Sequence, residues 1–445
     1  MEQATPGAGE SVCEEQSAIG AGAPTRYRRR AVLLGAAAGV GATAGLVAAK
    51  QLADAASAAV QQASTSLPTG PVPTGVAASD TAAVQAAMTA NSGGTTYLTN
   101  PGTFAIDATV HLSGSLVLGP STILQASTTI AGPVVDTPVG TFLQNVQIVG
   151  GIIDAHNLAY NCLYIRYHGP IYVETDCINA TQDYVILGDP AAAGSGYGAT
   201  LGPSMSITNP AGSFNAGYSN LNIQNSTDNV IYIANMQGAE TGVTSMTGDN
   251  KFISTHPNGG TGQPMVQCFF DISNSNTYTA CTVDTVTPLA HSGATGSASN
   301  NVITDAAIKA QHRGLPVTGT HIPAGSYVGP VTAGTSFLLV TNANNDVSPT
   351  GTVSGIRLAG VGWNAAGYGP GLMLANCVAF EGSAGGVDNS CYAITVGPGV
   401  TALPVSNFNV LGVSAAYRWI APFTGNTTVV EYFGLQQTNV VTGPR

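Results

Sequence analysis

Short runs of β-branched and apolar residues, separated by Gly, Asn, Asp and Ser, follow one another along most of the chain from residue 95 onward. Examples are "GSLVLG", "STILQAS", "NVQIVGGIID", "CLYIRY" and "YVILG". Runs of this length and composition are typical of β-strands, and the segments between them lack a helical pattern. The pattern therefore predicts an all-β fold, built either as a sandwich or as a β-solenoid.

A recurring phrase favours the solenoid. The segments "NVQIVGGIIDAHNLAYNCLYI", "PIYVETDCINATQDYVILG" and "YSNLNIQNSTDNVIYI" each contain a strand, a polar corner, and an Asn- or Asp-marked turn into another strand. The first two repeat at about 22 residues, which matches the length of one solenoid coil. Stacked coils bury a continuous core that a single coil cannot bury alone. We expect the main body of this stack to cover residues 79–284.

One helix is predicted before the strands begin. In "SDTAAVQAAM", Val84 and Met88 lie on one helical face, Asp80 lies near the N-terminus, and the double glycine at 93–94 follows. A stack of strands leaves an unpaired edge at its end, and such edges promote aggregation. We therefore expect this helix to cover the first coil.

Four sequence motifs occur in this order in this part of the chain: "SDTAAVQAAMTA", "GGTTYLTNPGTFAI", "ILQAS" and "GGIIDAHN". Together they resemble the opening of the pectate-lyase-like superfamily, from residue 79 to about 165. The chain departs from that family at "GVAAS", where members usually carry a Gly-Asp-Gly-x-x-Asp-Asp run. The resemblance implies a right-handed parallel β-helix with an N-terminal capping helix. It also implies action on polysaccharides, along a groove on the outside of the stack.

The pattern changes between residues 285 and 358, where the strand spacing is hairpin-like and Gly/Pro turns are regular. This segment resembles small β-sandwich modules of phage structural proteins and exported bacterial proteins. We predict a small inserted β module here, followed by C-terminal coils over 359–445. The alternative is that the whole region consists of irregular coils.

The N-terminus has the order of an export signal. In "YRRRAVLLGAAAGVGATAGLVAAKQLADAASA", a basic cluster precedes a Gly/Ala-rich apolar stretch and then small residues. "RRAVLL" resembles the bacterial twin-arginine signal. We therefore predict a signal at 1–58 that engages the export machinery, a linker at 59–78, and a secreted or extracellular-surface protein. The alternative is an uncleaved membrane anchor over 31–49.

Charge narrows the range of partners. The formal net charge is -11, only 8% of residues are charged, and Arg166 is the only Lys or Arg between Lys50 and Lys251. Such a surface has no basic stripe to follow a phosphate backbone, so we expect no nucleic acid partner. An acidic polysaccharide would also be repelled in bulk, unless cations or a local Arg hold it.

Cysteine usage agrees with export. Cys13 belongs to the leader, and six cysteines remain, an even count that suggests disulfides in an exported chain. We expect local pairing, with buried reduced thiols as the alternative. No C-x-x-C is present and no His clusters with the cysteines, so no cofactor is expected; calcium stays open without a recognisable site. The six residues are Cys162, Cys177, Cys268, Cys281, Cys377 and Cys391.

The first candidate site is a column of polar corner residues. Aligning the three phrases places Asn161, Asp183 and Asp228 at the same corner of successive coils. Glycoside hydrolysis uses two carboxyl groups, and repulsion between neighbouring Asp183 and Asp228 would raise one pKa, which gives an acid and a base. The alternative is that Asn and Asp at corners hydrogen-bond the turn backbone.

The second candidate site is the segment "IRYHG…VETD". β-Elimination of a uronate needs a base, commonly Arg or Lys, and a group that neutralises the substrate carboxylate. We take Arg166 and Asp176 as catalytic candidates, and His168 and Glu174 as substrate-binding candidates. Asp154 in "GGIIDAHN" is added as a substrate-binding candidate. The alternatives are an ordinary ion pair at Arg166 and a turn role for Asp154.

Function follows mainly from the resemblance. We expect an extracellular polysaccharide lyase or glycoside hydrolase, although the motif set of polygalacturonases and the acidic calcium cluster of pectate lyases are both missing. The competing hypothesis is a non-catalytic glycan-binding attachment protein of the cell-surface or phage-tail kind, often a homotrimer. A purely structural surface protein is a third hypothesis, since fold alone does not imply function.

Overall fold

The computed structural model describes residues 70–366 except 193, 211–213, 260–264, 274 and 342–344, together with short segments between 368 and 438. The predicted export signal and most of the predicted linker lie outside these residues, as does the alternative of a membrane anchor. Within the described part of the chain, no helix is long and apolar enough to span a membrane.

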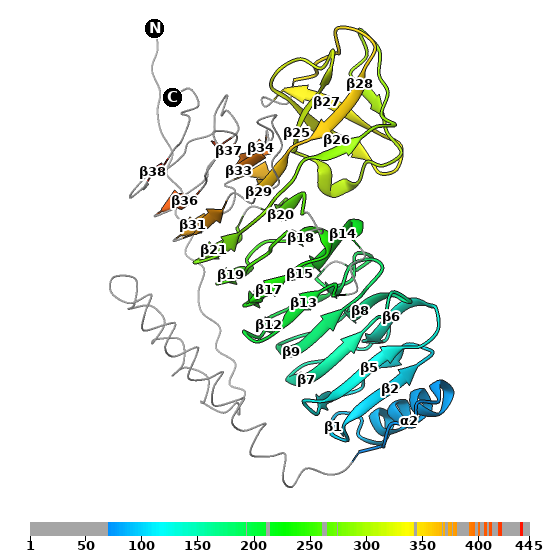
Figure 1. Ribbon diagram of the computed structural model, residues 1–445. Helices are drawn as coiled ribbons and strands as arrows, with labels where there is room; N and C mark the ends of the chain where they lie inside the picture. Colours follow the sequence, from blue (N-terminus) through cyan, green and yellow to red (C-terminus); the bar gives the residue numbers. More distant parts are fainter. Residues whose placement is uncertain are drawn as a thin grey trace, which may run out of the picture. The chain divides into compact units, whose positions relative to one another are not determined.

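The described chain is dominated by parallel β-sheet (Figure 1). Two long sheets contain most of the strands; we call the 14-stranded sheet A and the 10-stranded sheet B. Strands alternate between the two sheets along the chain, as β7 (Val146–Asp154), β8 (Ala159–Ile165), β9 (Ile171–Ile178) and β10 (Val185–Leu187) do. Within each sheet these neighbours pair in parallel, β7 with β9 and β8 with β10. The prediction of an all-β, mainly parallel fold is confirmed.

Sheet A continues along the whole described chain. Its main path is β1 (Thr95–Leu98), β4 (Ser115–Leu118), β7, β9, β12 (Ala199–Leu201), β16 (Val230–Ile231), β19 (Lys251–Ile253), β21 (Thr277–Thr279), β31 (Met373–Ala375) and β35 (Val405–Ser406). The strands beside this path are β2 (Gly102–Ile106), β5 (Thr122–Ala126), β13 (Ser206–Thr208) and β17 (Asn235–Met236).

Sheet B runs beside it, in the order β3 (Val110–His111), β6 (Ile130–Asp136), β8, β10, β14 (Asn215–Ile223), β18 (Ala239–Ser245), β20 (Gln267–Asp271), β29 (Gly360–Ala365), β33 (Cys391–Val396) and β37 (Tyr417–Ile420). Smaller parallel groups pair β11 (Gly196–Tyr197) with β15 (Ser226–Thr227), β30 (Tyr368–Gly369) with β34 (Gly399–Val400), and β22 (Thr282–Val283), β32 (Val378–Phe380), β36 (Asn409–Leu411) and β38 (Gln437–Thr438) in a row.

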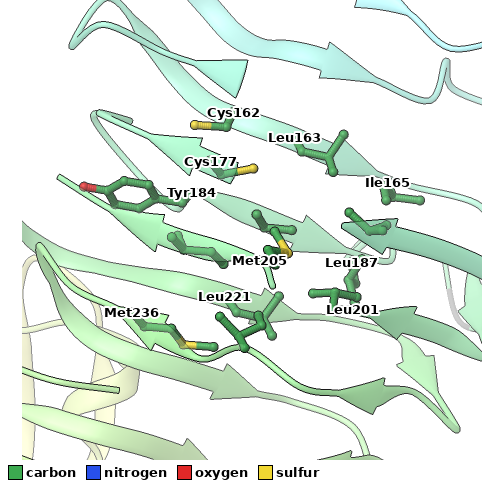
Figure 2. Packing of buried hydrophobic residues seen from close by; sticks show 14 of the residues in the cluster. Cys162, Leu163, Ile165, Cys177, Tyr184, Leu187, Leu201, Met205, Leu221 and Met236 are labelled. Carbon is green, nitrogen blue, oxygen red and sulfur yellow. The ribbon is translucent and has the colours of Figure 1, made fainter. Parts of the chain in front are cut away.

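The core lies between the facing sides of the strands. Along β9 buried and half-exposed residues alternate strictly, so every second side chain points inward. Figure 2 shows these inward side chains from several strands packing together, among them Leu163, Leu187, Leu201 and Leu221, all fully buried. Burial of each such side chain contributes roughly 1.5–3 kcal/mol. The repeated inward apolar positions therefore hold one strand on the next.

Helix α2 (Ala77–Ala90) covers the first strands, as predicted, and begins two residues earlier than the sequence pattern indicates. Val84 and Met88 are fully buried against the core. Side chains of the helix also accept hydrogen bonds from edge N–H groups that no strand pairs. The acceptors are Asp80, Thr81 and Gln85, and the backbone donors are Ala105, Asp107 and His111.

The end of the predicted linker is attached to the first strands. The Asn100 amide donates to the carbonyl oxygens of Gly70 and Pro71 at 2.7 and 3.0 Å. The N–H groups of Thr74 and Gly75 donate to Asp80 at 2.8 and 3.0 Å. The described part of the linker therefore has fixed hydrogen-bond partners.

An antiparallel module interrupts the parallel strands, within the 285–358 segment where an insertion was predicted. Its six strands are β23 (Leu289–His291), β24 (Val302–Thr304), β25 (Pro316–Thr320), β26 (Ser326–Thr332), β27 (Ser336–Thr341) and β28 (Ser354–Leu358), with the short 3-10 helix η1 (Ala310–His312) between β24 and β25. Leu315, Phe337 and Ile356 belong to its own buried cluster. β20 pairs directly with β29, with Phe269 opposite Trp363, so the parallel register resumes where the module ends.

The expected local disulfides are absent: no disulfide joins the six cysteines in the part of the chain that the structure describes. Their thiols lie on neighbouring strands and donate to backbone carbonyl groups, as Cys268 does to Pro257 and Cys281 to Phe252. Cys162 and Cys177, which are close in sequence, do hydrogen-bond each other, whereas Cys281 hydrogen-bonds Cys377, which follows β31 and lies beyond the inserted module. This arrangement matches the alternative expectation for the cysteines, which was buried and reduced thiols.

Candidate functional site

The outward side of β9 carries three functional side chains in a row. Ile171, Val173, Thr175 and Cys177 are buried, so the residues between them face outward. We call these outward residues, Tyr172, Glu174 and Asp176, the β9 row. Two of the three were predicted site residues, Asp176 as catalytic and Glu174 as substrate-binding. The strand's two-residue period places both carboxyl groups on one face.

Glu174 has one hydrogen-bonded oxygen and one buried oxygen without a hydrogen-bond partner among the described residues. The Tyr172 hydroxyl donates to Glu174 Oε2, whereas Oε1 is buried without a hydrogen-bond partner among the described residues. Burial, followed by the hydrogen bond to Glu174, raises the pKa of Tyr172 far above its usual value. The phenol therefore stays protonated and keeps donating, which leaves the second carboxylate oxygen of Glu174 as an acceptor.

Asp176 has a different environment. Its Oδ1 accepts a hydrogen bond from the Ser206 N–H at 2.8 Å. Burial nevertheless raises the pKa of Asp176, because the loss of solvation exceeds the effect of that single bond. A carboxyl group with a raised pKa keeps its proton to higher pH, as a general acid requires. Glu174 and Asp176 are therefore two neighbouring carboxyl groups in unlike surroundings.

The next strand is irregular beside this row. Val173 pairs with Leu201 and Cys177 with Ile207, so three residues of β9 face five residues of the β12–β13 segment. Extra residues of this kind make a bulge, and bulges are frequent next to functional sites. The bulge begins at Gly202, where a Cβ would lie 2.7 Å from the Tyr172 hydroxyl oxygen. Glycine here leaves the space in which the Tyr172 and Glu174 side chains lie.

A second cluster lies on sheet B and contains Arg166. His111 Nδ1 lies 2.6 Å from Asp136 Oδ1, and an Arg166 terminal nitrogen lies 3.7 Å from Asp136 Oδ2. The guanidinium carbon lies 3.8 Å above the centre of the Tyr164 ring. We call these four residues the Arg166 cluster. The His111 side chain is half-exposed, whereas that of Asp136 is buried.

The sequence analysis missed His111 and Asp136. They come from β3 and β6, far before Arg166, and the register of sheet B aligns them: His111 pairs with Asp136, and Asp136 with Tyr164. The recurring strand spacing could have suggested this column, since His111 and Asp136 each end a strand and Arg166 follows one. The predicted grouping of Arg166 with Glu174 and Asp176 is wrong, because Arg166 follows β8 of sheet B while both acids lie on β9 of sheet A.

The pairing of Asp183 with Asp228 is also wrong. Asn161 and Asp183 do share a corner, with the Asn161 amide donating to the Asp183 carbonyl at 2.5 Å. Val185 then pairs with Leu221, which is 36 residues later instead of 22, and so Ser219 occupies the next corner. The longer segment shifts Asp228 to an exposed turn with φ 57°.

Asp183 has a structural environment. Its side chain accepts hydrogen bonds from the Ser219 N–H at 2.6 Å and the Asn222 amide at 2.9 Å. Burial raises the pKa of Asp183, and these bonds offset only part of that effect. Asp183 therefore fits the alternative expectation, in which a corner Asp hydrogen-bonds the backbone of the turn.

His168 and Asp154 hold the backbone and neighbouring side chains. His168 is fully buried, with Nε2 3.0 Å from the Ser226 hydroxyl, and burial lowers its pKa. It is therefore out of reach of a polymer. Asp154 is also buried and accepts bonds from Gln125, the His156 N–H and Asn179 at 2.7–2.9 Å. Its two oxygens are thus already used.

Comparison of the chain with protein-family models, curated proteins and solved structures found no match. Among the residues that the structure describes, no group of three or more His, Cys, Asp or Glu side chains is placed to hold a metal ion. The functional argument therefore depends on the β9 row and the Arg166 cluster themselves.

Proposed function

We propose that the protein is a right-handed parallel β-helix of the pectate-lyase-like kind. Three features support this: strands that alternate between two parallel sheets, a continuous core between them, and a helix over the first strands. The family-like phrases of residues 79–165 agree with the same fold.

The function that the geometry favours most is hydrolysis of a polysaccharide at the β9 row. The observation that carries it is the pair Glu174 and Asp176 on one outward face, the first with an oxygen that has no hydrogen-bond partner among the described residues and the second with a raised pKa. Glycosidases use such a pair, one carboxyl group as the acid and the other as the base or nucleophile. The Cα atoms of residues two apart on a strand are separated by roughly 6.6 Å, and inverting enzymes hold their two carboxyl groups roughly 6.5–9.5 Å apart, so two such side chains can reach that spacing.

The chemical step then assigns one role to each side chain. Asp176 gives its proton to the glycosidic oxygen as the bond from that oxygen to the anomeric carbon breaks. The Glu174 carboxylate takes a proton from a water molecule whose oxygen forms the new bond to the anomeric carbon. Tyr172 holds Glu174 in place through Oε2. A neutral polymer suits this acidic row best, because the chain carries a net charge of -11.

Lyase chemistry at the Arg166 cluster is the second candidate. The specific observation is that His111, whose side chain is half-exposed, and Arg166 contact the two oxygens of the same Asp136 carboxylate. An oriented imidazole can remove a proton, and a guanidinium can neutralise a uronate carboxylate. We place either activity outside the cell, after export by the twin-arginine-like signal.

The test is incubation of the mature protein with a panel of neutral and acidic polysaccharides, with and without calcium. Reducing ends and the ultraviolet absorbance of unsaturated uronates would both be followed. Hydrolysis at the β9 row predicts reducing ends without that absorbance, and their loss by a factor of about 10²–10⁴ in Glu174→Gln and Asp176→Asn. Asp228→Asn, an exposed carboxylate elsewhere, is the matched control.

Two other results would redirect the proposal. Unsaturated products that disappear in His111→Gln and Arg166→Gln would assign the reaction to the Arg166 cluster. Glycan binding without any product, unchanged in all of these variants, would refute catalysis and favour an attachment protein.

A further inference from the structure

Two aromatic side chains lie together on the outer surface, just before the strands of sheet A that surround the β9 row. Phe142 is 49% exposed and Tyr197 is 45% exposed, and their ring centres are 6.3 Å apart with an interplanar angle of 36°. Large apolar side chains gain stability from burial, so a pair this exposed indicates a surface that meets a ligand. We call Phe142 and Tyr197 the aromatic platform.

The two rings come from segments that are two steps apart in the stack of strands. Isolated parallel bridges join Leu143 to His168 and His168 to Gly196, so the segment of His168 lies in the middle. Leu143 and His168 are buried, and the residues on either side of them therefore face outward. Two steps between neighbouring strands span roughly 9.6 Å, whereas the ring centres are 6.3 Å apart. The rings therefore lean toward each other across the middle segment.

A glycine in the middle segment makes this approach possible. A Cβ at Gly169 would lie 3.3 Å from Phe142 Cζ and 3.3 Å from the Tyr197 hydroxyl oxygen. The φ angle of Gly169 lies outside the left-handed region, so the backbone at this position would accept another residue. The glycine therefore serves to leave space, and the two rings fill that space.

The surface around the aromatic platform is uncharged. The segments that supply and adjoin it, 137–145, 167–173 and 194–203, contain no Asp, Glu, Lys or Arg. Their one histidine, His168, is buried, and burial lowers its pKa. Two neutral amide side chains next to the rings, those of Gln144 and Asn145, are exposed. An uncharged ligand with both an apolar face and hydroxyl groups suits this surface, and a sugar ring has both.

The aromatic platform lies between the two clusters described above along the chain. Arg166 is three residues before Gly169, and Tyr172, the first residue of the β9 row, is three residues after it. Three residues span at most roughly 11 Å. A polymer bound at the β9 row is therefore long enough to reach the rings as well.

We propose that the aromatic platform is a binding subsite for an uncharged sugar ring of the polysaccharide that occupies the β9 row. The inference rests on the proposed function in one respect, because it takes the ligand to be a polysaccharide. It assigns binding to two residues that take no part in the proposed hydrolysis, and it specifies a neutral sugar at this position.

Affinity electrophoresis of the full chain tests the proposal, in native gels that contain xyloglucan, galactomannan or, as the acidic comparison, polygalacturonate. All proteins carry Glu174→Gln, so that the polymer is not shortened during the run. At least one neutral polysaccharide should slow migration, and polygalacturonate should slow it less. Phe142→Ala and Tyr197→Ala should each weaken the affinity by about tenfold or more, as loss of an aromatic anchor commonly does.

Further variants separate ring stacking from general packing. Phe142→Trp keeps a flat ring and should bind as the parent does, whereas Phe142→Leu keeps apolar surface without a flat ring and should lose affinity as Phe142→Ala does. Gly169→Ala should weaken binding by a smaller factor, because its methyl group would push the rings apart. Tyr160→Ala removes an exposed tyrosine of β8 outside the platform and is the matched control, with unchanged affinity. If an alanine variant does not fold, as judged by circular dichroism, the Trp and Leu variants still provide the comparison.

The platform and the proposed hydrolysis can fail separately. Hydrolysis by the wild type, with unchanged binding and turnover in Phe142→Ala and Tyr197→Ala, would overturn the platform and leave hydrolysis standing. Binding that these variants lose, in a protein whose wild type cuts no polysaccharide, would support the platform and refute hydrolysis. Migration that no polysaccharide slows would overturn the platform. So would a change of particle mass in light scattering with unchanged sugar binding, which would assign the rings to a contact between copies of the chain.

Discussion

Glu174 on β9 and Glu240 on β18 are the same residue type on outward faces of neighbouring parallel sheets, yet their surroundings differ. Glu174 is half-buried, with one oxygen bonded to Tyr172 and the other without a hydrogen-bond partner among the described residues. Glu240 is 2% exposed, and both of its oxygens are bonded, to His312 and to the Gly217 N–H. The two carboxylates therefore differ in what packs over the strand: His312 of the antiparallel module contacts Glu240, whereas alternate residues of β9 remain half-exposed.

The largest expected effect comes from removing each carboxylate in turn. Glu240→Ala should lower the free energy of unfolding by about 3–5 kcal/mol, because it breaks a buried pair and leaves His312 Nε2 and the Gly217 N–H without an acceptor. Glu174→Ala should change it by less than about 1 kcal/mol, because its neighbours can bond to water. Denaturant unfolding followed by circular dichroism measures both. Equal losses would show that the two faces do not differ in this way.

The sheet edge under α2 sharpens the comparison. Asp80 accepts bonds from Thr74, Gly75 and the Ala105 N–H, and Asp80→Ala should cost about 2–3 kcal/mol and promote aggregation. Burial acts to raise the pKa of Asp80, but these bonds outweigh it and the pKa is lowered. The contribution is therefore present above about pH 3.9 and is lost as the pH falls through the lowered value. Unfolding midpoints and light scattering would be compared with those of the exposed-site variant Asp228→Ala.

Gly202→Ala tests whether the arrangement of the β9 row depends on the bulge beside it. The new Cβ would meet the Tyr172 hydroxyl at 2.7 Å and Glu174 Cβ at 3.0 Å, so both side chains must move. Hydrolysis should fall by about tenfold or more, with a loss of stability of about 1–3 kcal/mol. Gly293→Ala, where nothing lies within 4 Å of the added Cβ, is the matched control for both measurements. Unchanged turnover in Gly202→Ala would separate Tyr172 and Glu174 from the reaction.

The smallest expected effect is the pH dependence of Asp176. Burial raises the pKa of this carboxyl group, so ionisation opposes folding and the protein gains stability as the pH falls through the raised value. Asp176→Asn should remove that part of the pH dependence and also the alkaline decline of hydrolysis that a general acid causes. Unfolding midpoints at closely spaced pH values measure the first effect and rate profiles the second. A variant whose stability profile is identical to that of the wild type would contradict the assignment.

The sequence predicted the features that depend on local pattern. Val84 and Met88 marked the helix, and the 22-residue repeat joined Leu163 to Val185 correctly. The β9 row was only partly anticipated, since Glu174 and Asp176 were selected but grouped with Arg166.

The predictions that proved wrong depended on segments between strands being equal in length, which they are not. The 36-residue step from Val185 to Leu221 moved Asp228 away from the predicted corner. His111 and Asp136 meet through sheet register, which local composition does not reveal. The thiol contact of Cys281 with Cys377 likewise spans the inserted module, so close spacing along the chain was a poor guide to it.

The place where the module leaves and rejoins the parallel strands has a consequence for how such a chain can change. Its entry strand β23 and exit strand β28 are antiparallel neighbours, with Leu289 opposite Leu358, so the two ends of the insertion are adjacent. Closing a loop whose ends already meet costs little more entropy when the loop is long, because the cost grows only with the logarithm of its length. A short hairpin or an unrelated domain with adjacent termini can therefore occupy the same position while β20 still pairs with β29. The junction is therefore a position at which one inserted domain can replace another while the parallel strands on either side stay paired.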